Sequence, residues 1–95
     1  MNFFSEQHKA ALISCIEVTL MRNGNTNFNL IVAKLDALYD CQVRDCYDHP
    51  EYLQKVLKEV YKDDYKSIIN EIKMCLDDLI NEKDLSDFFK IMEQY

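Results

Sequence analysis

The side chains of this chain best suited to metal binding or nucleophilic chemistry are four cysteines and two histidines. Cys41, Cys46 and His49 lie within nine residues, in a Cys-x4-Cys-x2-His pattern. Zinc binds thiolate and imidazole at about 2.0–2.3 Å, so these three side chains could share one ion. A fourth ligand would have to come from Cys15, Cys75, His8 or an aspartate. A structural zinc module is therefore one alternative for this chain.

Other features of the cysteines favour a chain without metal or other cofactor. The spacing is not the Cys-x2-Cys of common zinc sites, and the sequence has no second cysteine pair of that kind. Cys15 and Cys75 fall on apolar helical faces, where cysteine usually acts as a small hydrophobic residue. We predict core or loop thiols, with His49 at the start of a helix.

Cysteine catalysis is disfavoured by the neighbours of the candidate nucleophile. Cys46 lies just before a predicted helix N-terminus, which favours thiolate, and His49 is close in sequence. Asp45 and Asp48 oppose this effect, because nearby negative charge raises a thiol pKa. The single glycine, Gly24, cannot build an oxyanion-binding loop around that thiol. We therefore predict that the chain is not an enzyme.

Paired carboxylates occur at Asp63–Asp64 and Asp77–Asp78. The first pair falls at a predicted helix start and the second on a predicted solvent face. Neither lies in an apolar pattern that would separate two pKa values for acid–base catalysis. Helix capping and solvation account for both pairs.

Aromatic residues suggest an interaction surface. Tyr47 and Tyr52 lie around the longest stretch without helical periodicity, and tyrosine favours interfaces because its ring is apolar while its hydroxyl stays hydrated. Phe88, Phe89 and Met92 lie on one face of a terminal helix. We predict that these five residues bind a partner. The alternative is that the tyrosines line the rim of the core and the last helix completes it.

Apolar residues recur every three or four positions along nearly the whole chain, which predicts amphipathic helices. The expected helices cover about residues 5–23, 27–39, 50–61, 64–81 and 85–94. No segment shows the alternation of a strand. The fold class is thus all-α: one domain over residues 1–95, a compact bundle of about five short antiparallel helices. The core helices fall within about residues 5–81.

Capping residues set the expected helix ends. Gly24 is predicted to end the first helix in a left-handed conformation, and Pro50 to occupy the first position of the third. The predicted N-terminal caps are Ser5, Thr26 or Asn27, Asp48 or His49, Asp63, and Asp84. Val43 and Tyr47 are expected to hold the loop 40–48 against the core.

Charge limits the classes of partner. Seventeen acidic and eleven basic residues give a net charge of −6, which repels phosphate backbones, so we expect no direct binding to nucleic acid. A small acidic inhibitor of a nucleic-acid enzyme remains an alternative. No apolar run approaches the roughly 20 residues of a membrane span, and the first residues lack the features of a signal peptide. We therefore expect a cytoplasmic protein with four reduced thiols.

Four stretches resemble one known family. They are Ile16-Glu17-x-x-Leu20, Leu35-x-x-Leu38-Tyr39, Asp48-x-Pro50-Glu51-x-Leu53-x-x-Val56-Leu57-x-x-Val60-Tyr61, and Ile68-Ile69-x-x-Ile72-x-x-x-Leu76. Together they resemble the Nitrosopumilus output domain family over about residues 12–80. The family pattern favours glycine between the third and fourth helices, where this chain has Lys62.

The resemblance implies a non-catalytic signalling output module from the archaeal cytoplasm. Such a module relays a regulatory state by contact with another protein. It implies no catalytic residues. We therefore expect a small helical protein-interaction or regulatory domain whose partner is another protein, or a second copy of this chain in a homodimer.

Overall fold

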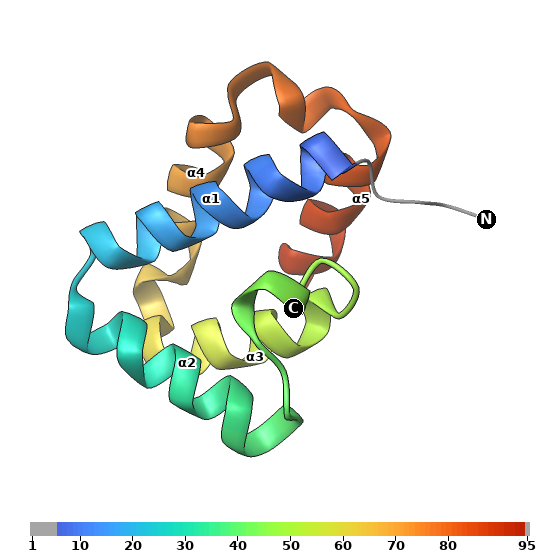
Figure 1. The fold of residues 1–95 in the computed structure, drawn as a ribbon. Helices are drawn as coiled ribbons and strands as arrows, with labels where there is room; N and C mark the ends of the chain where they lie inside the picture. The colour runs from blue at the N-terminus through green and yellow to red at the C-terminus, as the bar shows by residue number, and fades with distance from the viewer. Residues whose placement is uncertain (1–5, 95) are drawn as a thin grey trace.

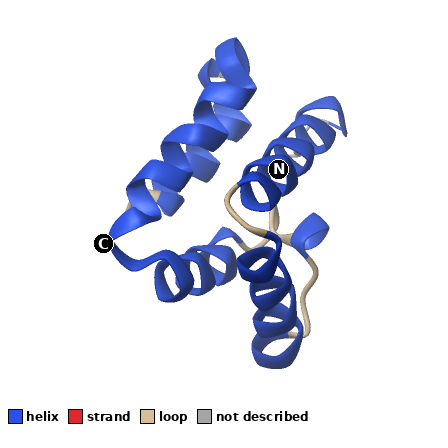
Figure 2. Cartoon of the chain, turned by 90° about the vertical axis from the view of Figure 1, so that its left-hand side faces the viewer, coloured by secondary structure: helices blue, strands red, loops and turns tan. Residues whose placement is uncertain are grey.

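The computed structural model describes residues 6–94, and this part of the chain is all α-helical. Its five α-helices are α1 (Glu6–Arg22), α2 (Asn25–Tyr39), α3 (Pro50–Tyr61), α4 (Tyr65–Leu76) and α5 (Lys83–Met92). Three short 3₁₀ turns join them: η1 (Val43–Asp45), η2 (Lys62–Asp64) and η3 (Asp77–Asn81). No strand occurs in the described residues (Figure 2). The all-α prediction is confirmed.

The helices pack in pairs around one core. α1 packs mainly against α4, and α2 packs mainly against α3 (Figure 1). α5 packs against α3 and also contacts α1. None of the helices described is both long enough and apolar enough to cross a bilayer.

The core follows the helical periodicity of the sequence. On α3, Leu53, Val56 and Leu57 are fully buried on one face, with the spacing of a 3.6-residue repeat. Each of the other α-helices also contributes a buried face to this core. The side chains that are fully excluded from solvent are Leu12, Ile16, Leu20, Ile31, Leu35, Cys46, Leu53, Val56, Leu57, Leu85 and Met92.

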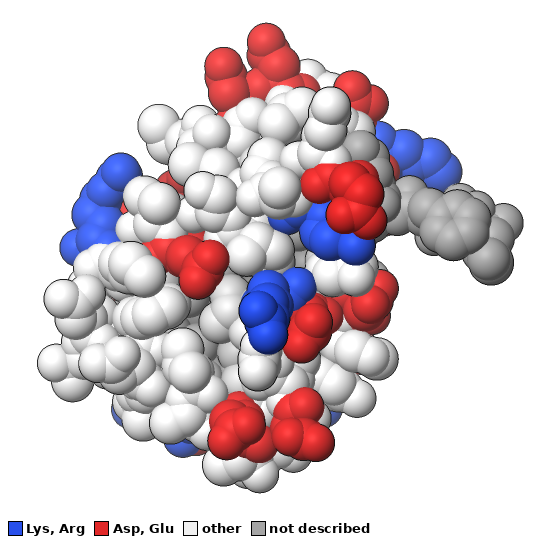
Figure 3. Space-filling view, viewed as in Figure 1, with Lys and Arg blue, Asp and Glu red and all other residues white. Residues whose placement is uncertain are grey.

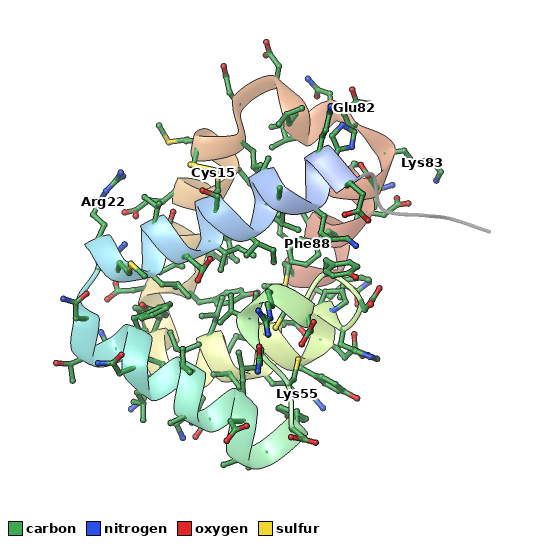
Figure 4. The ribbon with its side chains drawn as sticks, in the orientation of Figure 1. Cys15, Arg22, Lys55, Glu82, Lys83 and Phe88 are labelled. Atoms are coloured by element: carbon green, nitrogen blue, oxygen red, sulfur yellow. A yellow bond between two sulfur atoms is a disulfide. The ribbon has the colours of Figure 1, made fainter. Side chains whose placement is uncertain are left out.

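The last helix belongs to this core. Phe88 and Phe89 are each 3% exposed and Met92 is fully buried. Phe88 points into the interior of the molecule, whereas Arg22 and Lys83 point away from it (Figure 4). The three apolar side chains of α5 therefore complete the core, and our assignment of them to an interaction surface is corrected.

Several helix ends differ from the prediction. α2 begins two residues earlier than expected, directly after Gly24, whose φ is 116°. No side chain caps the N-terminus of α2, α3, α4 or α5 by a hydrogen bond. Asp84 lies inside the first turn of α5, where its carboxylate accepts the N–H of Leu85 at 2.8 Å and contacts His8 Nδ1 at 2.9 Å. The predicted cap Ser5 lies outside the described residues.

The predicted fourth helix is divided in two. α4 ends at Leu76, and Asp77 has a positive φ of 56°, after which the chain continues as η3. Leu79 and Ile80 in this turn still pack against the core. Leu76, Leu79 and Ile80 keep the i, i+3, i+4 spacing of a helix in the sequence, so the apolar pattern gives no sign of the break.

Backbone strain is present at Lys62, between α3 and α4. Lys62 has φ 51° and ψ −114°, a conformation that glycine adopts far more readily than a residue with a Cβ. Its N–H donates to the carbonyl of Lys58, a bond that glycine would keep.

We predict that Lys62→Gly raises the free energy of unfolding by about 1 kcal/mol, because it relieves this strain. Lys55→Gly is the matched control: Lys55 is exposed in the middle of α3, and glycine there should lower stability by about 1 kcal/mol. Urea unfolding followed by circular dichroism measures both. Equal destabilisation by the two substitutions would contradict the prediction.

Candidate functional site: a groove between α1, α2 and η1

An open groove of about 640 Å³ lies between α1, α2 and the segment that contains η1. α1 contributes Glu17, and α2 contributes several residues from one side of the helix. The segment after α2 forms the remaining wall with residues 41–44. The lining residues of α2 are Phe28, Asn29, Val32, Ala33 and Asp36.

α2 carries apolar residues outside its buried face, and one of them, Val32, lines the groove. Ile31 and Leu35 are fully buried in the core. Leu30, Val32 and Leu38 are nevertheless 43%, 41% and 59% exposed. A helix with apolar residues on several faces is usually covered on those faces. Within the described residues, α2 thus has more apolar surface than the fold covers.

Few charges interrupt this region. Figure 3 shows mostly uncharged side chains over the lower left of the face, where α2 lies in Figure 1. The groove is lined by one carboxylate from α1 (Glu17), one from α2 (Asp36) and one guanidinium from η1 (Arg44). An apolar surface with a polar edge suits the amphipathic face of a partner helix.

The structure brings Cys41 and Cys46 together but leaves His49 apart from them. The two Sγ atoms are 3.9 Å apart, and both side chains are buried. His49 is exposed, with Nδ1 3.5 Å from Glu51 Oε1 and its ring stacked on that of Tyr52. No three metal-ligating side chains converge anywhere in residues 6–94. The zinc alternative therefore lacks its third ligand.

Burial also disfavours Cys46 as a nucleophile. Burial raises the pKa of the Cys46 thiol well above its ordinary value, and Cys41, Asp45 and Glu51 raise it further. The thiolate is the reactive form, so little of it is present at neutral pH.

The predicted tyrosines lie outside the groove. Tyr52 stacks on Tyr39 with ring centroids 4.4 Å apart. Tyr47 lies beneath the ammonium of Lys9, 4.2 Å from the ring centroid, and a hydrogen bond from this ammonium to Tyr47 raises the Lys9 pKa. Both tyrosines are half-buried and make contacts within the chain.

Sequence reasoning missed the residues that line the groove. The periodicity of the second helix predicted a buried face but did not single out Val32, which lines the groove and is 41% exposed. A signal was present in the sequence, because apolar residues of this helix also fall outside a single stripe. Which of them remained uncovered depended on how the other helices pack.

One cysteine prediction is wrong. Cys15 of α1 and Cys75 of α4 form a disulfide, with Cα atoms 5.7 Å apart, and are not reduced thiols (Figure 4). This Cα separation is typical of disulfides. The sequence indicated that each cysteine lies on an apolar helical face, but it did not indicate that these two faces meet.

Comparisons with known proteins yielded no match to a family model, a curated protein or a solved structure. The functional interpretation therefore depends on the groove and the chemistry of its residues.

We predict that reducing the Cys15–Cys75 disulfide lowers the free energy of unfolding by about 2–4 kcal/mol, because the bond joins residues 60 positions apart. Thermal unfolding with and without dithiothreitol measures the change. The double variant Cys15→Ser/Cys75→Ser should be as unstable without reductant and should not respond to it. An equal response of both proteins would contradict the prediction.

Proposed function

We propose that this chain is a non-catalytic protein-interaction module that acts as a regulatory output domain. The proposal rests on one observation: Val32 of α2 lines the groove and is 41% exposed, beside the half-buried Phe28. Apolar surface bordered by polar residues is a common feature of protein-binding sites. The role of the module is to present this surface to another protein.

The shape of the groove supports a helix as the bound element. α2 forms one long side of the groove, where the lining residues Phe28 and Val32 lie one helical turn apart. A partner helix would bury Val32 and Phe28 and leave Glu17 and Asp36 at the edge of the contact. This is the helix-in-groove mode of recognition.

A signalling role is proposed from the resemblance to the Nitrosopumilus output domain family. In that role, the module receives a state from a sensor and transmits it by binding. A cytoplasmic location is part of the same proposal. A homodimer through this face is a second form of the same mechanism. The chain has a net charge of −6, but α2 carries one lysine and one aspartate, so two copies of α2 would not repel each other by net charge.

We predict that Val32→Lys weakens partner binding at least tenfold, since it places a charge in the apolar groove; tenfold corresponds to about 1.4 kcal/mol. Leu30→Lys is the matched control: it is on the same helix and is similarly exposed, at 43% against 41%, but it does not line the groove. Affinity capture from an extract of the source cells, followed by binding measurements on the captured protein, compares both variants with the parent chain.

Size-exclusion chromatography with light scattering tests the homodimeric form. In that form, the parent chain and Leu30→Lys are dimers and Val32→Lys is a monomer. A strictly monomeric parent chain that captures no protein sensitive to Val32→Lys would refute the proposed function.

A further inference from the structure

The two free cysteines flank η1 and converge on one backbone carbonyl. The thiols of Cys41 and Cys46 each donate to the carbonyl oxygen of Gln42 at 3.4 Å. Their Sγ atoms are 3.9 Å apart, so bond formation at about 2.05 Å requires the sulfurs to approach by roughly 1.9 Å. The bond therefore requires the two side chains to rotate toward each other, together with a shift of the short loop that joins them.

We propose that Cys41 and Cys46 are a redox modification site, at which a small-molecule disulfide forms a second intramolecular disulfide across η1. The reagent class is a low-molecular-weight disulfide such as oxidised glutathione. The site is distinct from the Cys15–Cys75 disulfide, which joins α1 to α4.

The position of Cys41 determines the order of the reaction. Cys41 lines the groove and is 7% exposed, whereas Cys46 is fully buried, so a small reagent that enters the groove meets the Cys41 side chain first. The Cys41 thiol loses its proton and attacks one sulfur of the reagent. This forms a mixed disulfide at Cys41 and releases the other half of the reagent, which takes up a proton as a free thiol.

Cys46 then resolves the mixed disulfide. It loses its proton and attacks Cys41 Sγ, and the second half of the reagent leaves as a thiol. Two protein thiols have lost two protons and two electrons, and the reagent has become two thiols. The Cys46 pKa is raised by its burial, by Cys41 and by the carboxylates of Asp45 and Glu51, so this second step is the slow one at neutral pH.

The new bond changes the wall of the groove. Residues 41–44 form that wall, and a disulfide from Cys41 to Cys46 restrains the segment at both ends. It also draws Cys41 Sγ toward Cys46. This regulatory consequence rests on the proposed function, because it concerns docking of a partner in the same groove. The thiol chemistry itself is independent of the proposed function.

The rest of the molecule is consistent with redox chemistry. One cysteine pair is already a disulfide in this structure. The same chain therefore holds one cysteine pair that is oxidised and a second pair that is free but close in space. Oxidation of the second pair then gives the module two discrete states at its binding surface.

The test uses the full chain with its Cys15–Cys75 disulfide intact. The protein is incubated with oxidised glutathione, and free thiols are counted after denaturation. We expect both remaining thiols to be lost with no glutathione retained. Two thiols that stay free, or glutathione that stays attached to the parent chain, would overturn the proposal.

Trypsin locates the new bond, because Arg44 lies between the two cysteines. Cleavage after Lys34, Arg44 and Lys55 yields separate peptides 35–44 and 45–55 from the reduced loop. After oxidation, we expect these peptides to remain linked until reductant is added. Linkage of either peptide to Cys15 or Cys75 instead would contradict the assignment.

Single substitutions test the order of the steps. Cys46→Ser should accumulate one glutathione on Cys41, since the resolving thiol is missing. Cys41→Ser should react at least tenfold more slowly, since the remaining thiol is buried. Equal reaction of the two variants would contradict the assigned order, and circular dichroism verifies that both are folded.

Binding is measured only after the thiol chemistry is established. If the disulfide forms but the affinity of a groove-dependent partner is unchanged, the modification site stands and its regulatory effect is refuted. If the disulfide forms and no partner depends on Val32, the proposed function fails while the modification site remains. The two proposals are thus tested separately.

Discussion

Burial of apolar side chains from all five helices in one core is the constraint on which the rest of this structure depends. A chain of this length buries only about 60–65% of its unfolded surface, so each helix must contribute a face. α5 contributes Phe88, Phe89 and Met92, all nearly excluded from solvent. Because α2 to α5 lack side-chain caps at their N-termini, tertiary packing rather than capping holds these helices in place.

The same packing creates the groove. α1 packs mainly against α4 and α2 mainly against α3, so the two helices face each other over only part of their surfaces. The chain then continues from η1 into α3, so residues 41–44 line one side of the groove and do not close it. The apolar residues on the outer side of α2 therefore have no covering element among residues 6–94. The open groove thus arises from the way the core is completed.

The periodicity of apolar residues was sufficient to predict the helices, but it was not sufficient to predict the groove. α3 was predicted at its observed bounds, because Pro50 marks its start and its buried face follows a regular repeat. The break at Asp77 was missed, since a positive φ in a non-glycine residue leaves no trace in an apolar pattern. The groove and the Cys15–Cys75 disulfide were missed for another reason: both depend on which helices become neighbours, which is a property of the tertiary fold.

The disulfide between α1 and α4 gives the chain the connectivity of a closed ring with two tails. The ring runs from Cys15 to Cys75 and includes all of α2, η1 and α3, while α5 lies on the tail beyond it. A single backbone cut inside the ring leaves both fragments covalently joined. A cut after Leu76 instead separates α5 and opens the core. A single proteolytic cut within α2 or η1 therefore leaves the segments around the groove covalently joined, whereas a single cut after Leu76 detaches α5.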